Sequence, residues 1–331
     1  MRTVRFHEFG PPEVLTVEET PVPRPGPGQV LIAAEAVSVG FAQTQMRRDI
    51  FPAPMWDRKL PSVLGGDVVG RIEAVGPDVR GMRPGDRVGA FTLYGAYADY
   101  VVVDADTVLP VPEGLDAAAA TALPSSGPIA AGTLDVGMVK PGDVVLVHAA
   151  SGGIGHISVQ MAKTAGAVVV GTAGSSGKCE FVRGLGADHV VDYSSDDWPA
   201  QVRAAVGERG VDLVLDSVGG SVLRAGLDLL APMGRLVFYG SAGGGREVPS
   251  ISVMELIRLK YVTAFALSTW RANRREQYEA SLVDLADGLT TGRYQHAVYQ
   301  KLDLTDAAKA HALIEARAHT GRIVLIPGGD R

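Results

Sequence analysis

The sequence predicts an α/β protein in two parts, a β-rich barrel or sandwich followed by a doubly wound parallel sheet. The chain has 331 residues, which is more than one typical domain. Up to about Leu109, short β-rich runs alternate with Gly and Pro turns such as residues 21–28, PVPRPGPG. From Asp143 onward, uniformly apolar runs alternate with helical segments, which is typical of parallel strands covered on both faces.

The first part is expected to be mostly strand, with one early helix. That helix is predicted over residues 42–48, and a second helical segment over residues 116–122 follows the Pro-rich break at 110–114. The predicted strands, taken from the β-branched runs, cover residues 14–17, 30–37, 68–75, 88–91 and 97–103.

The second part is expected to alternate strands and helices, and the chain then returns to the first part. Helices over 272–287 and 306–316 and a last strand over 322–326 are too little for a third domain. We therefore assign residues 1–123 and 268–331 to one domain and residues 124–267 to the other. The strands of the second domain are predicted to centre on Val145, Val169, Val190, Val214, Val237 and Val262.

The most informative stretch, residues 143–174, is a strand, a tight turn, a helix and a second strand. Its turn, Ala150-Ser151-Gly152-Gly153-Ile154-Gly155, fits the dinucleotide fingerprint G-x-G-x-x-G with alanine in the first glycine's place. Small residues there let the backbone approach a pyrophosphate at the helix N-terminus. An ordinary βα turn is the alternative. The context favours a nucleotide site, with Ala150, Gly152, Gly153 and Ile154 as ligands.

The end of the next strand indicates which nucleotide is bound. NAD sites usually carry an acidic residue there for the ribose 2′-hydroxyl, but residues 171–178 read GTAGSSGK. Gly174, Ser175 and Lys178 would instead accommodate and counter-charge a 2′-phosphate. We therefore predict NADPH rather than NADH. Lys178 could also be a solvated lysine in the first turn of the next helix.

Composition restricts the remaining possibilities. Apolar residues make up 46% of the chain and charged residues 21%, with no run long enough to span a membrane. The start lacks the apolar segment of a signal peptide, and a single cysteine, Cys179, cannot form an internal disulfide, so we expect a cytoplasmic protein. The net charge of −6, without a basic run, argues against a broad nucleic-acid surface.

Several motifs together resemble one family. Residues 9–15 (FGPPEVL), 84–88 (PGDRV), 149–155 (AASGGIG) and 171–174 (GTAG) are similar to the zinc-independent quinone oxidoreductases, the zeta-crystallin group of the medium-chain dehydrogenase/reductase superfamily. The resemblance implies a GroES-like β-barrel catalytic domain and a Rossmann NADPH-binding domain with a cleft between them. It also implies a homodimer that pairs through edge strands near residues 261–267.

No zinc is expected. Zinc-dependent relatives carry a Gly-His-Glu stretch, a catalytic cysteine and a four-cysteine lobe, whereas this chain has Gly65-Gly66-Asp67 and Cys179 as its one cysteine. Neither a Cys₄ site nor a Cys/His site can be assembled from these residues. Reduction of an electron-poor acceptor, which needs no Lewis acid, is therefore favoured over alcohol oxidation.

The resemblance also implies further coenzyme ligands. Those that follow the later strands could alternatively be plain strand ends, and Tyr193 could be a tyrosine half-buried in a loop. Lys178 and Tyr193 match residues that contact the 2′-phosphate, and Arg322 would add a further cation from the last strand. The remaining implied ligands follow later strands of the second domain: Ser217, Val218, Tyr239, Gly240, Phe265 and Leu267.

The acceptor pocket departs from the family pattern. Gly40 and Phe51 replace polar residues common in the group, and Gln43 replaces a carboxylate. The pocket is thus expected to be apolar, lined by Phe41, Phe51 and Phe265, with Gln43 and Tyr94 as the remaining hydrogen-bond donors. Gln43 could equally be a glutamine on the barrel surface.

The function expected from these residues is NADPH-dependent hydride transfer to a quinone or another conjugated carbonyl compound. A rival is an enoyl-type reductase of a 2-enoyl thioester or an unsaturated biosynthetic intermediate, which an apolar pocket would also suit. A rival of another class is an NADPH-binding structural or RNA-interacting protein, for which turnover would be negligible.

Overall fold

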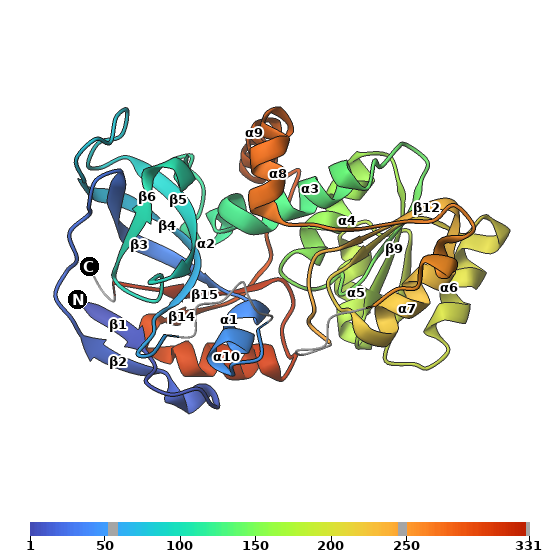
Figure 1. The fold of residues 1–331 in the computed structure, drawn as a ribbon, viewed down its shortest axis with the longest axis horizontal. Helices are drawn as coiled ribbons and strands as arrows, with labels where there is room; N and C mark the ends of the chain where they lie inside the picture. Colours follow the sequence, from blue (N-terminus) through green and yellow to red (C-terminus); the bar gives the residue numbers. More distant parts are fainter. Residues whose placement is uncertain (52–58, 244–249, 329–331) are drawn as a thin grey trace. The chain divides into compact units, whose positions relative to one another are not determined.

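The computed structural model describes residues 1–51, 59–243 and 250–328, and it divides into two compact units. The first unit comprises Met1–Ser126 and Leu285–Arg331, and the second comprises Gly127–Asp284. The first and the last of the described strands both belong to the first unit (Figure 1).

The first unit is built on a seven-stranded sheet and a separate two-stranded sheet. The large sheet has the order β14-β15-β3-β4-β5-β7, with β6 paired to β3, and its β3–β4 and β4–β5 pairs are antiparallel. The strands are β1 (Arg2–Arg5), β2 (Thr16–Glu19), β3 (Gln29–Val39), β4 (Leu64–Val75), β5 (Arg87–Tyr94), β6 (Tyr100–Asp104), β7 (Leu109–Pro110), β14 (Val298–Asp303) and β15 (Arg322–Ile326).

Short helices close the first unit around an apolar core. Phe6, Ile32, Leu64 and Ile72 are almost completely buried there, and burying a side chain of this size contributes about 1.5–3 kcal/mol. The helices are the 3₁₀ turns η1 (Pro12–Val14), η2 (Ala105–Thr107) and η6 (Leu304–Asp306), the π-helix η3 (Ala122–Ser126), α1 (Phe41–Arg47), α2 (Ala117–Ala120) and α10 (Ala307–Glu315).

A buried polar network also joins distant segments of the first unit. Arg47, at the end of α1, is fully buried and donates from Nε to His311 Nδ1 of α10 at 3.2 Å. Its two other nitrogens donate to the Gly10 carbonyl and to Glu315. His311 Nε2 lies 3.0 Å from the Tyr97 hydroxyl. Four segments far apart in sequence are thereby fixed around one guanidinium.

The second unit is a six-stranded sheet with helices along it. Its order is β10-β9-β8-β11-β12-β13, and all neighbouring pairs are parallel. The strands are β8 (Val144–Val147), β9 (Val168–Ala173), β10 (His189–Asp192), β11 (Val211–Asp216), β12 (Leu230–Phe238) and β13 (Tyr261–Ala264). The helices are α3 (Gly127–Val136), α4 (Gly155–Thr164), α5 (Ser176–Gly184), α6 (Trp198–Val206), α7 (Gly220–Leu229) and α8 (Leu267–Asn273), with the 3₁₀ turns η4 (Gly207–Arg209) and η5 (Val253–Leu256).

This order is that of a doubly wound sheet, so the predicted fold class is confirmed. Pairing proceeds outward from β8 in one direction and from β11 in the other. Because crossover connections are right-handed, the helices of the two halves are expected on opposite faces of such a sheet. Loops at the carboxyl ends of β8 and β11 flank the reversal of strand order, where such sheets bind ligands.

The boundary between the units differs from the expected one at the C-terminal side. We assigned residues 268–331 to the first domain, but residues 268–284, comprising α8 and the first part of α9 (Arg275–Thr291), belong to the second unit. The reason is local: the Trp270 indole donates to Asp135 of α3 at 2.8 Å, and Arg274 donates to the same carboxylate at 2.9 Å.

Most predicted elements lie where the patterns placed them. All six strand centres of the second domain fall within β8 to β13, and the last strand is β15. Strand β14 was not predicted, because Val298–Asp303 mixes polar and apolar residues. In the described residues, no helix is both long and apolar enough to cross a membrane.

Candidate active site

The first turn of the second unit is built for close backbone approach. After β8, Ala149 adopts a positive φ of 49°, and the Ala150 N–H donates to the Thr172 carbonyl at 2.8 Å. A Cβ added to Gly155 would lie 2.4 Å from the Ala149 oxygen, and one added to Gly152 would lie 3.2 Å from it. The helix α4 can therefore begin this close to the strand only with glycine at position 155.

The alanine that replaces the first glycine has a structural explanation. The Ala150 side chain is fully buried, and a Cβ at Gly171 of β9 would lie only 3.1 Å from its methyl group. Gly171 thus leaves the space that the methyl group occupies. Alanine at this position fills a gap in the sheet and leaves the turn conformation intact.

The residues predicted to meet a 2′-phosphate gather at the ends of β9 and β10. Ser175 caps α5 by accepting the Lys178 N–H at 3.4 Å, and Gly174 and Ser175 are exposed. The Tyr193 N–H donates to the Ala173 carbonyl at 3.0 Å, and a Cβ at Gly174 would lie 3.6 Å from the Tyr193 ring. Gly174, Ser175, Lys178 and Tyr193 therefore form one cluster at this edge.

The acid that directly precedes Tyr193 is engaged in its own turn. Asp192, at the end of β10, accepts hydrogen bonds from the Ser194 backbone N–H at 2.9 Å and from its hydroxyl at 2.6 Å. These two donors hold the pKa of Asp192 below its ordinary value. The Asp192 carboxylate is therefore hydrogen-bonded to Ser194 within its own turn.

Asp216 contacts the loop after β11 with its carboxyl and the end of β12 with its backbone carbonyl. Asp216 is fully buried, and its Oδ1 accepts the N–H groups of Val218 at 2.6 Å and Gly219 at 3.0 Å, while its carbonyl accepts the Tyr239 N–H at 2.8 Å. Burial raises the pKa of Asp216. The carboxyl therefore fixes the loop that follows β11, and the backbone carbonyl of the same residue joins β11 to the end of β12.

The other coenzyme residues predicted at these strand ends lie beside it. The Ser217 carbonyl accepts the Ala242 N–H at 2.9 Å and would lie 3.2 Å from a Cβ at Gly240. Burial raises the pKa of the Tyr239 phenol, which stays protonated. The structure thus brings Ser217, Val218, Tyr239 and Gly240 into one loop cluster.

Phe265 and Leu267 lie past β13. The Phe265 N–H donates to the Phe238 carbonyl at 2.8 Å, and its ring packs against Trp270 with centroids 5.9 Å apart. The ring also covers Gly132 of α3, where a Cβ would lie 2.5 Å from it. Phe265 is fixed on α3, and Leu267 is the half-buried first residue of α8.

In the first unit, the predicted acceptor residues lie around α1. Gln43 is 5% exposed, and its side-chain oxygen accepts the Gly40 N–H at 3.0 Å, which caps the helix. Phe41 and Phe51 are partly buried against the barrel core. Tyr94 ends β5 and is 36% exposed. The Gln43 amide oxygen thus accepts from within the helix cap, and the amide nitrogen is the group of this side chain that can donate to a bound carbonyl.

Arg322 also belongs to this corner of the first unit. A Cβ at Gly40 would lie 3.0 Å from Arg322 Nη1, and Asp67 of β4 is the principal negative charge that acts on the guanidinium. Burial lowers the pKa of Arg322, and Asp67 opposes that shift. The structure thus places Arg322 with Gly40 and Asp67, whereas Lys178 and Tyr193 belong to the second unit.

Comparison with known proteins agrees with this geometry. Residues 26–113 match the model of the alcohol dehydrogenase GroES-like domain, and residues 153–287 match that of the zinc-binding dehydrogenases. A 2-haloacrylate reductase from Burkholderia sp is 37% identical over 329 residues, covering 97% of this chain and 98% of the relative. A quinone oxidoreductase from Pseudomonas aeruginosa is 32% identical, with 98% and 99% covered.

A solved structure agrees over the same length. The crystal structure of Escherichia coli quinone oxidoreductase complexed with NADPH has a TM-score of 0.91 and 30% identity, and the match covers 99% of this chain and 100% of that one. The chain belongs to the zinc-independent quinone oxidoreductase group of the medium-chain dehydrogenase/reductase superfamily. The predicted family is thereby confirmed.

The backbone around Gly65 and Gly66 leaves no room for the histidine that zinc-dependent relatives carry in this stretch. A Cβ at Gly65 would lie 1.9 Å from the Thr92 oxygen, and one at Gly66, whose φ is 157°, would lie 2.6 Å from the Ser38 oxygen. An imidazole in place of Gly66 would not fit this backbone. Within residues 1–51, 59–243 and 250–328, no three His, Cys, Asp or Glu side chains converge as metal ligands.

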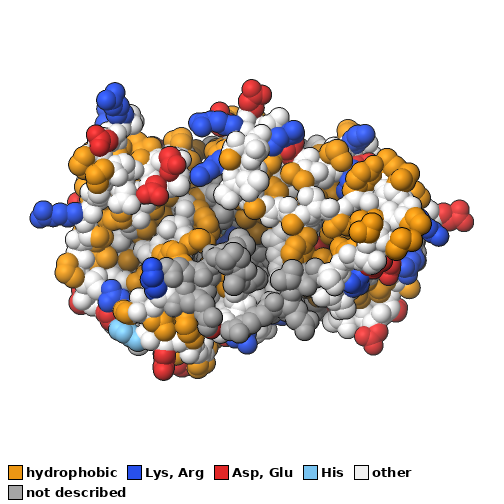
Figure 2. Space-filling view, viewed as in Figure 1, with side chains coloured by type: hydrophobic (Ala, Val, Ile, Leu, Met, Phe, Trp, Pro, Cys, Tyr) orange, Lys and Arg blue, Asp and Glu red, His pale blue; other side chains and the backbone are white. Residues whose placement is uncertain are grey.

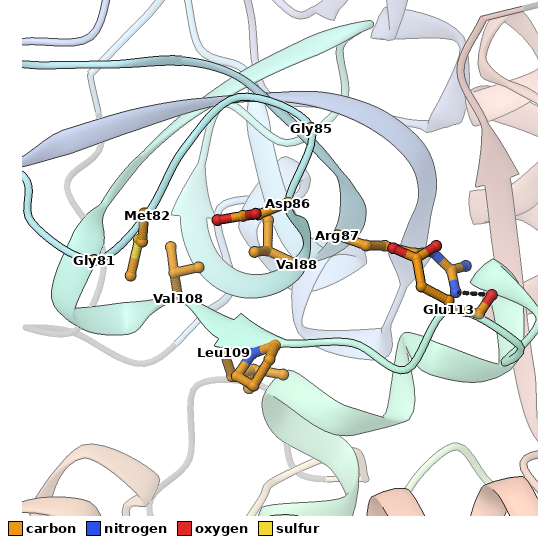
Figure 3. A pocket seen from close by; sticks show the side chains of 10 residues that line it. Gly81, Met82, Gly85, Asp86, Arg87, Val88, Val108, Leu109 and Glu113 are labelled. Atoms are coloured by element: carbon orange, nitrogen blue, oxygen red, sulfur yellow. Dashed lines mark hydrogen bonds between the residues drawn. The ribbon is translucent and has the colours of Figure 1, made fainter.

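A separate pocket of about 440 Å³ lies in the first unit of this protein (Figure 3). It is lined at the starts of β5 and β7, and none of the predicted site residues line it. Its charged groups already have partners: Asp86 accepts from Arg83, and Arg87 donates to Glu35 and to the Glu113 carbonyl. No binding role follows from this pocket.

The sequence prediction missed Asp67 and Ser38. Ser38 Oγ donates to Asp67 Oδ2 at 2.7 Å and accepts the Asp67 N–H at 3.1 Å, and both side chains are buried. A signal was present, because Asp67 is the one acid in the otherwise apolar run 63–70, VLGGDVVG. A buried acid without an evident partner often marks a functional site.

Proposed function

We propose that this protein transfers a hydride from NADPH to a quinone or another conjugated carbonyl compound. The observation that carries the proposal is the edge of the second unit, where a tight glycine turn and the Lys178–Tyr193 cluster lie beside consecutive strand ends. The NADPH complex of the Escherichia coli relative supports the same coenzyme.

The residues of the second unit fit a phosphorylated dinucleotide. Glycine at 152 and 155 leaves room for a pyrophosphate against the backbone, together with Ala150, Gly153 and Ile154. Ser175 and Lys178 would donate to the 2′-phosphate, Gly174 would leave it room, and Tyr193 would flank it. Arg322 of the first unit stays a proposed additional cation. Further proposed ligands are Ser217, Val218, Tyr239, Gly240, Phe265 and Leu267.

The acceptor would be bound by apolar surface with few donors. Phe41, Phe51 and Phe265 are the proposed apolar lining, and Gln43 and Tyr94 are the proposed donors to a carbonyl oxygen. When bound, NADPH supplies a hydride from its nicotinamide ring. The protein's own residues then contribute orientation, exclusion of water and hydrogen bonds to the oxygen that becomes anionic.

A second candidate acceptor is an alkene conjugated to a carboxyl or thioester group. The observation that favours it is the 37% identity to a 2-haloacrylate reductase over nearly the full chain. In such a substrate the hydride attacks carbon and gives an enolate, so the demands on the protein are similar.

One assay panel separates these candidates. Purified protein would be incubated with NADPH or NADH and a quinone, an enone, a 2-haloacrylate or a 2-enoyl thioester, and coenzyme oxidation followed. We expect turnover with NADPH well above that with NADH. Binding of NADPH without turnover of any acceptor would instead favour a structural or RNA-interacting role, which the net charge of −6 opposes.

We also propose a cytoplasmic homodimer formed at the edge of the second unit. Strand β13 pairs with β12 on one side, and no strand pairs with its other side among the described residues. Figure 2 shows hydrophobic side chains gathered on this unit around the place where Figure 1 labels β12. Large exposed apolar residues adjoin the edge: Val253, Met254, Ile257, Leu259 and Tyr261. A second copy of the chain would cover both the open side of β13 and these exposed apolar residues.

The dimer can be tested by one substitution and a matched control. Ile257→Asp should convert the dimer to a monomer in sedimentation velocity experiments. Val283→Asp alters a side chain that is also 72% exposed, but on α9, and should leave the dimer intact. A monomeric wild-type protein at micromolar concentration would contradict the proposal.

A further inference from the structure

A buried carboxyl in the first unit has an unused oxygen. Asp67 is 2% exposed, in the middle of the β4 run, and only Oδ2 is bonded by a side chain, the Ser38 hydroxyl at 2.7 Å. Oδ1 is buried and has no hydrogen-bond partner among the described residues. A buried, unbonded carboxylate oxygen is costly, whereas a protonated one is far less so.

The groups around Asp67 come from three elements besides its own strand. Ser38 lies on β3, Ser125 on η3 and Arg322 on β15. Burial raises the pKa of Asp67 and is the largest effect, and the Arg322 charge and the two hydroxyls act in the opposite direction. The net effect raises the pKa of Asp67 above its ordinary value, which favours the protonated carboxyl.

This carboxyl lies in the corner of the first unit that carries the proposed acceptor residues. Ser38 is two residues before Gly40, which caps α1 together with Gln43. Arg322 Nη1 approaches the Cβ position of Gly40 to 3.0 Å. Arg322 is therefore a neighbour both of Asp67 and of the Gly40–Gln43 cap, and Gln43 is one of the residues proposed to hold the acceptor oxygen.

We propose that Asp67 donates the proton that completes reduction of the acceptor, an inference that rests on the proposed function. The acceptor gains a hydride with its two electrons and becomes an enolate or a hydroquinone anion. The O–H bond at Asp67 Oδ1 then breaks, the proton bonds to that anion, and the electron pair stays on Asp67 as carboxylate. The positive charge of Arg322 stabilises the carboxylate that forms, and a water molecule then reprotonates Asp67.

The principal test is Asp67→Asn, which keeps the shape and an acceptor oxygen for Ser38 but has no acidic proton. Turnover with NADPH would be measured across pH for an enone and for a quinone. In the wild type, kcat should fall as pH rises and Asp67 loses its proton. In the variant, kcat for the enone should be about 10²-fold lower without that decline. The loss for the quinone should be smaller, because a hydroquinone anion is a weaker base.

Two further variants keep the test specific. Ser38→Ala removes a donor to the carboxylate, so it should move the decline in kcat to higher pH, which a purely structural role would not do. Asp106→Asn changes an exposed acid of η2 and should leave the pH profile unchanged. The dissociation constant of NADPH should be the same in all four proteins.

The outcomes distinguish a failure of the proton-donor role of Asp67 from a failure of the proposed function. If the wild type turns over and Asp67→Asn, folded by circular dichroism, has the same kcat and pH profile, Asp67 is not the donor and the proposed function stands. If the wild type reduces neither acceptor, the proposed function fails and this inference fails with it.

Discussion

The sites proposed in the two units are built from different kinds of groups. In the second unit, the edge near β8 and β9 is made of backbone groups and glycines, and side chains such as Lys178 are added at the rim. In the first unit, the corner around α1 depends on polar side chains, among them the buried Arg47 and Asp67 and the half-buried Arg322. The first kind of site tolerates few changes in shape, and the second tolerates few changes in charge.

The largest effect is expected from Gly155→Val, which tests the dependence of the second unit on backbone shape. Its Cβ would lie 2.4 Å from the Ala149 oxygen, so the start of α4 must move. We expect NADPH binding, measured by fluorescence titration, to weaken at least about a hundredfold, because close approach to the pyrophosphate is lost. Gly184→Ala, where nothing lies within 4 Å, is the control. Equal affinity in the two variants would contradict this view.

Arg47→Met tests the dependence of the first unit on charge. The change leaves Glu315, His311 and the Gly10 carbonyl without their donor. Removing one partner from a buried ionic network costs about 3–5 kcal/mol, so the unfolding free energy in urea should fall by that amount. Arg275→Ala breaks an exposed pair on α9 and should cost about 0.5 kcal/mol or less. A similar small loss for Arg47→Met would show that the network stabilises little.

Lys178→Ala sharpens the comparison at the rim of the second unit, where a side chain and not the backbone is expected to select the coenzyme. Hydrogen bonds to charged groups contribute about 1.5–3 kcal/mol, so NADPH should bind about ten- to a hundredfold more weakly while NADH is little affected. Arg183→Ala, in the last turn of the same helix, is the matched control. An equal loss for both coenzymes would assign Lys178 a structural role.

The smallest effect concerns a histidine buried in each unit. Burial lowers the pKa of His148 and of His311 to about 3, and the Arg47 charge adds to the shift of His311. Between pH 6.5 and 3 the unfolded chain binds a proton at each imidazole that the folded chain does not. Stability present above pH 6.5 is therefore lost on acidification, by about 1.4 kcal/mol per pH unit for each histidine.

That pH dependence can be assigned to a residue in one unit. His148→Gln should reduce the slope of unfolding free energy against pH by the contribution of one group, measured in urea between pH 6 and 5. The Thr172 hydroxyl, 3.0 Å from His148 Nδ1, can still bond a glutamine. A slope equal to that of the wild type would mean that His148 becomes protonated in the folded protein.

Much of the fold could be predicted from the sequence because its signals are local. The uniformly apolar runs predicted the six parallel strands, and the glycine turn predicted the start of α4. Strand β14 was missed because its residues Val298–Asp303 follow no clear alternation, and pairing with β15 determines its conformation. The placement of α8 depends on Trp270 and Asp135, which are far apart in sequence.

Local sequence patterns predicted the part of the candidate site in the second unit but not the polar cluster of the first unit. Ser175 and Lys178 could be identified because they follow a strand and begin a helix, a pattern visible within eight residues. Asp67, Ser38 and Arg322 come from three strands, and their proximity is a property of the sheet register. Spacing along the chain carries no information on such a meeting. The ligand roles themselves remain predictions.

The glycine turn after β8 would not keep its conformation in another scaffold if only residues 149–155 were transferred. The methyl group of Ala150 occupies space left by Gly171, and a Cβ there would also lie 2.5 Å from Val182 on α5. The three positions form one interlocking unit that spans a turn, a strand and a helix. A successful graft must therefore carry all three residues, because a change at one of them requires the other two to make room.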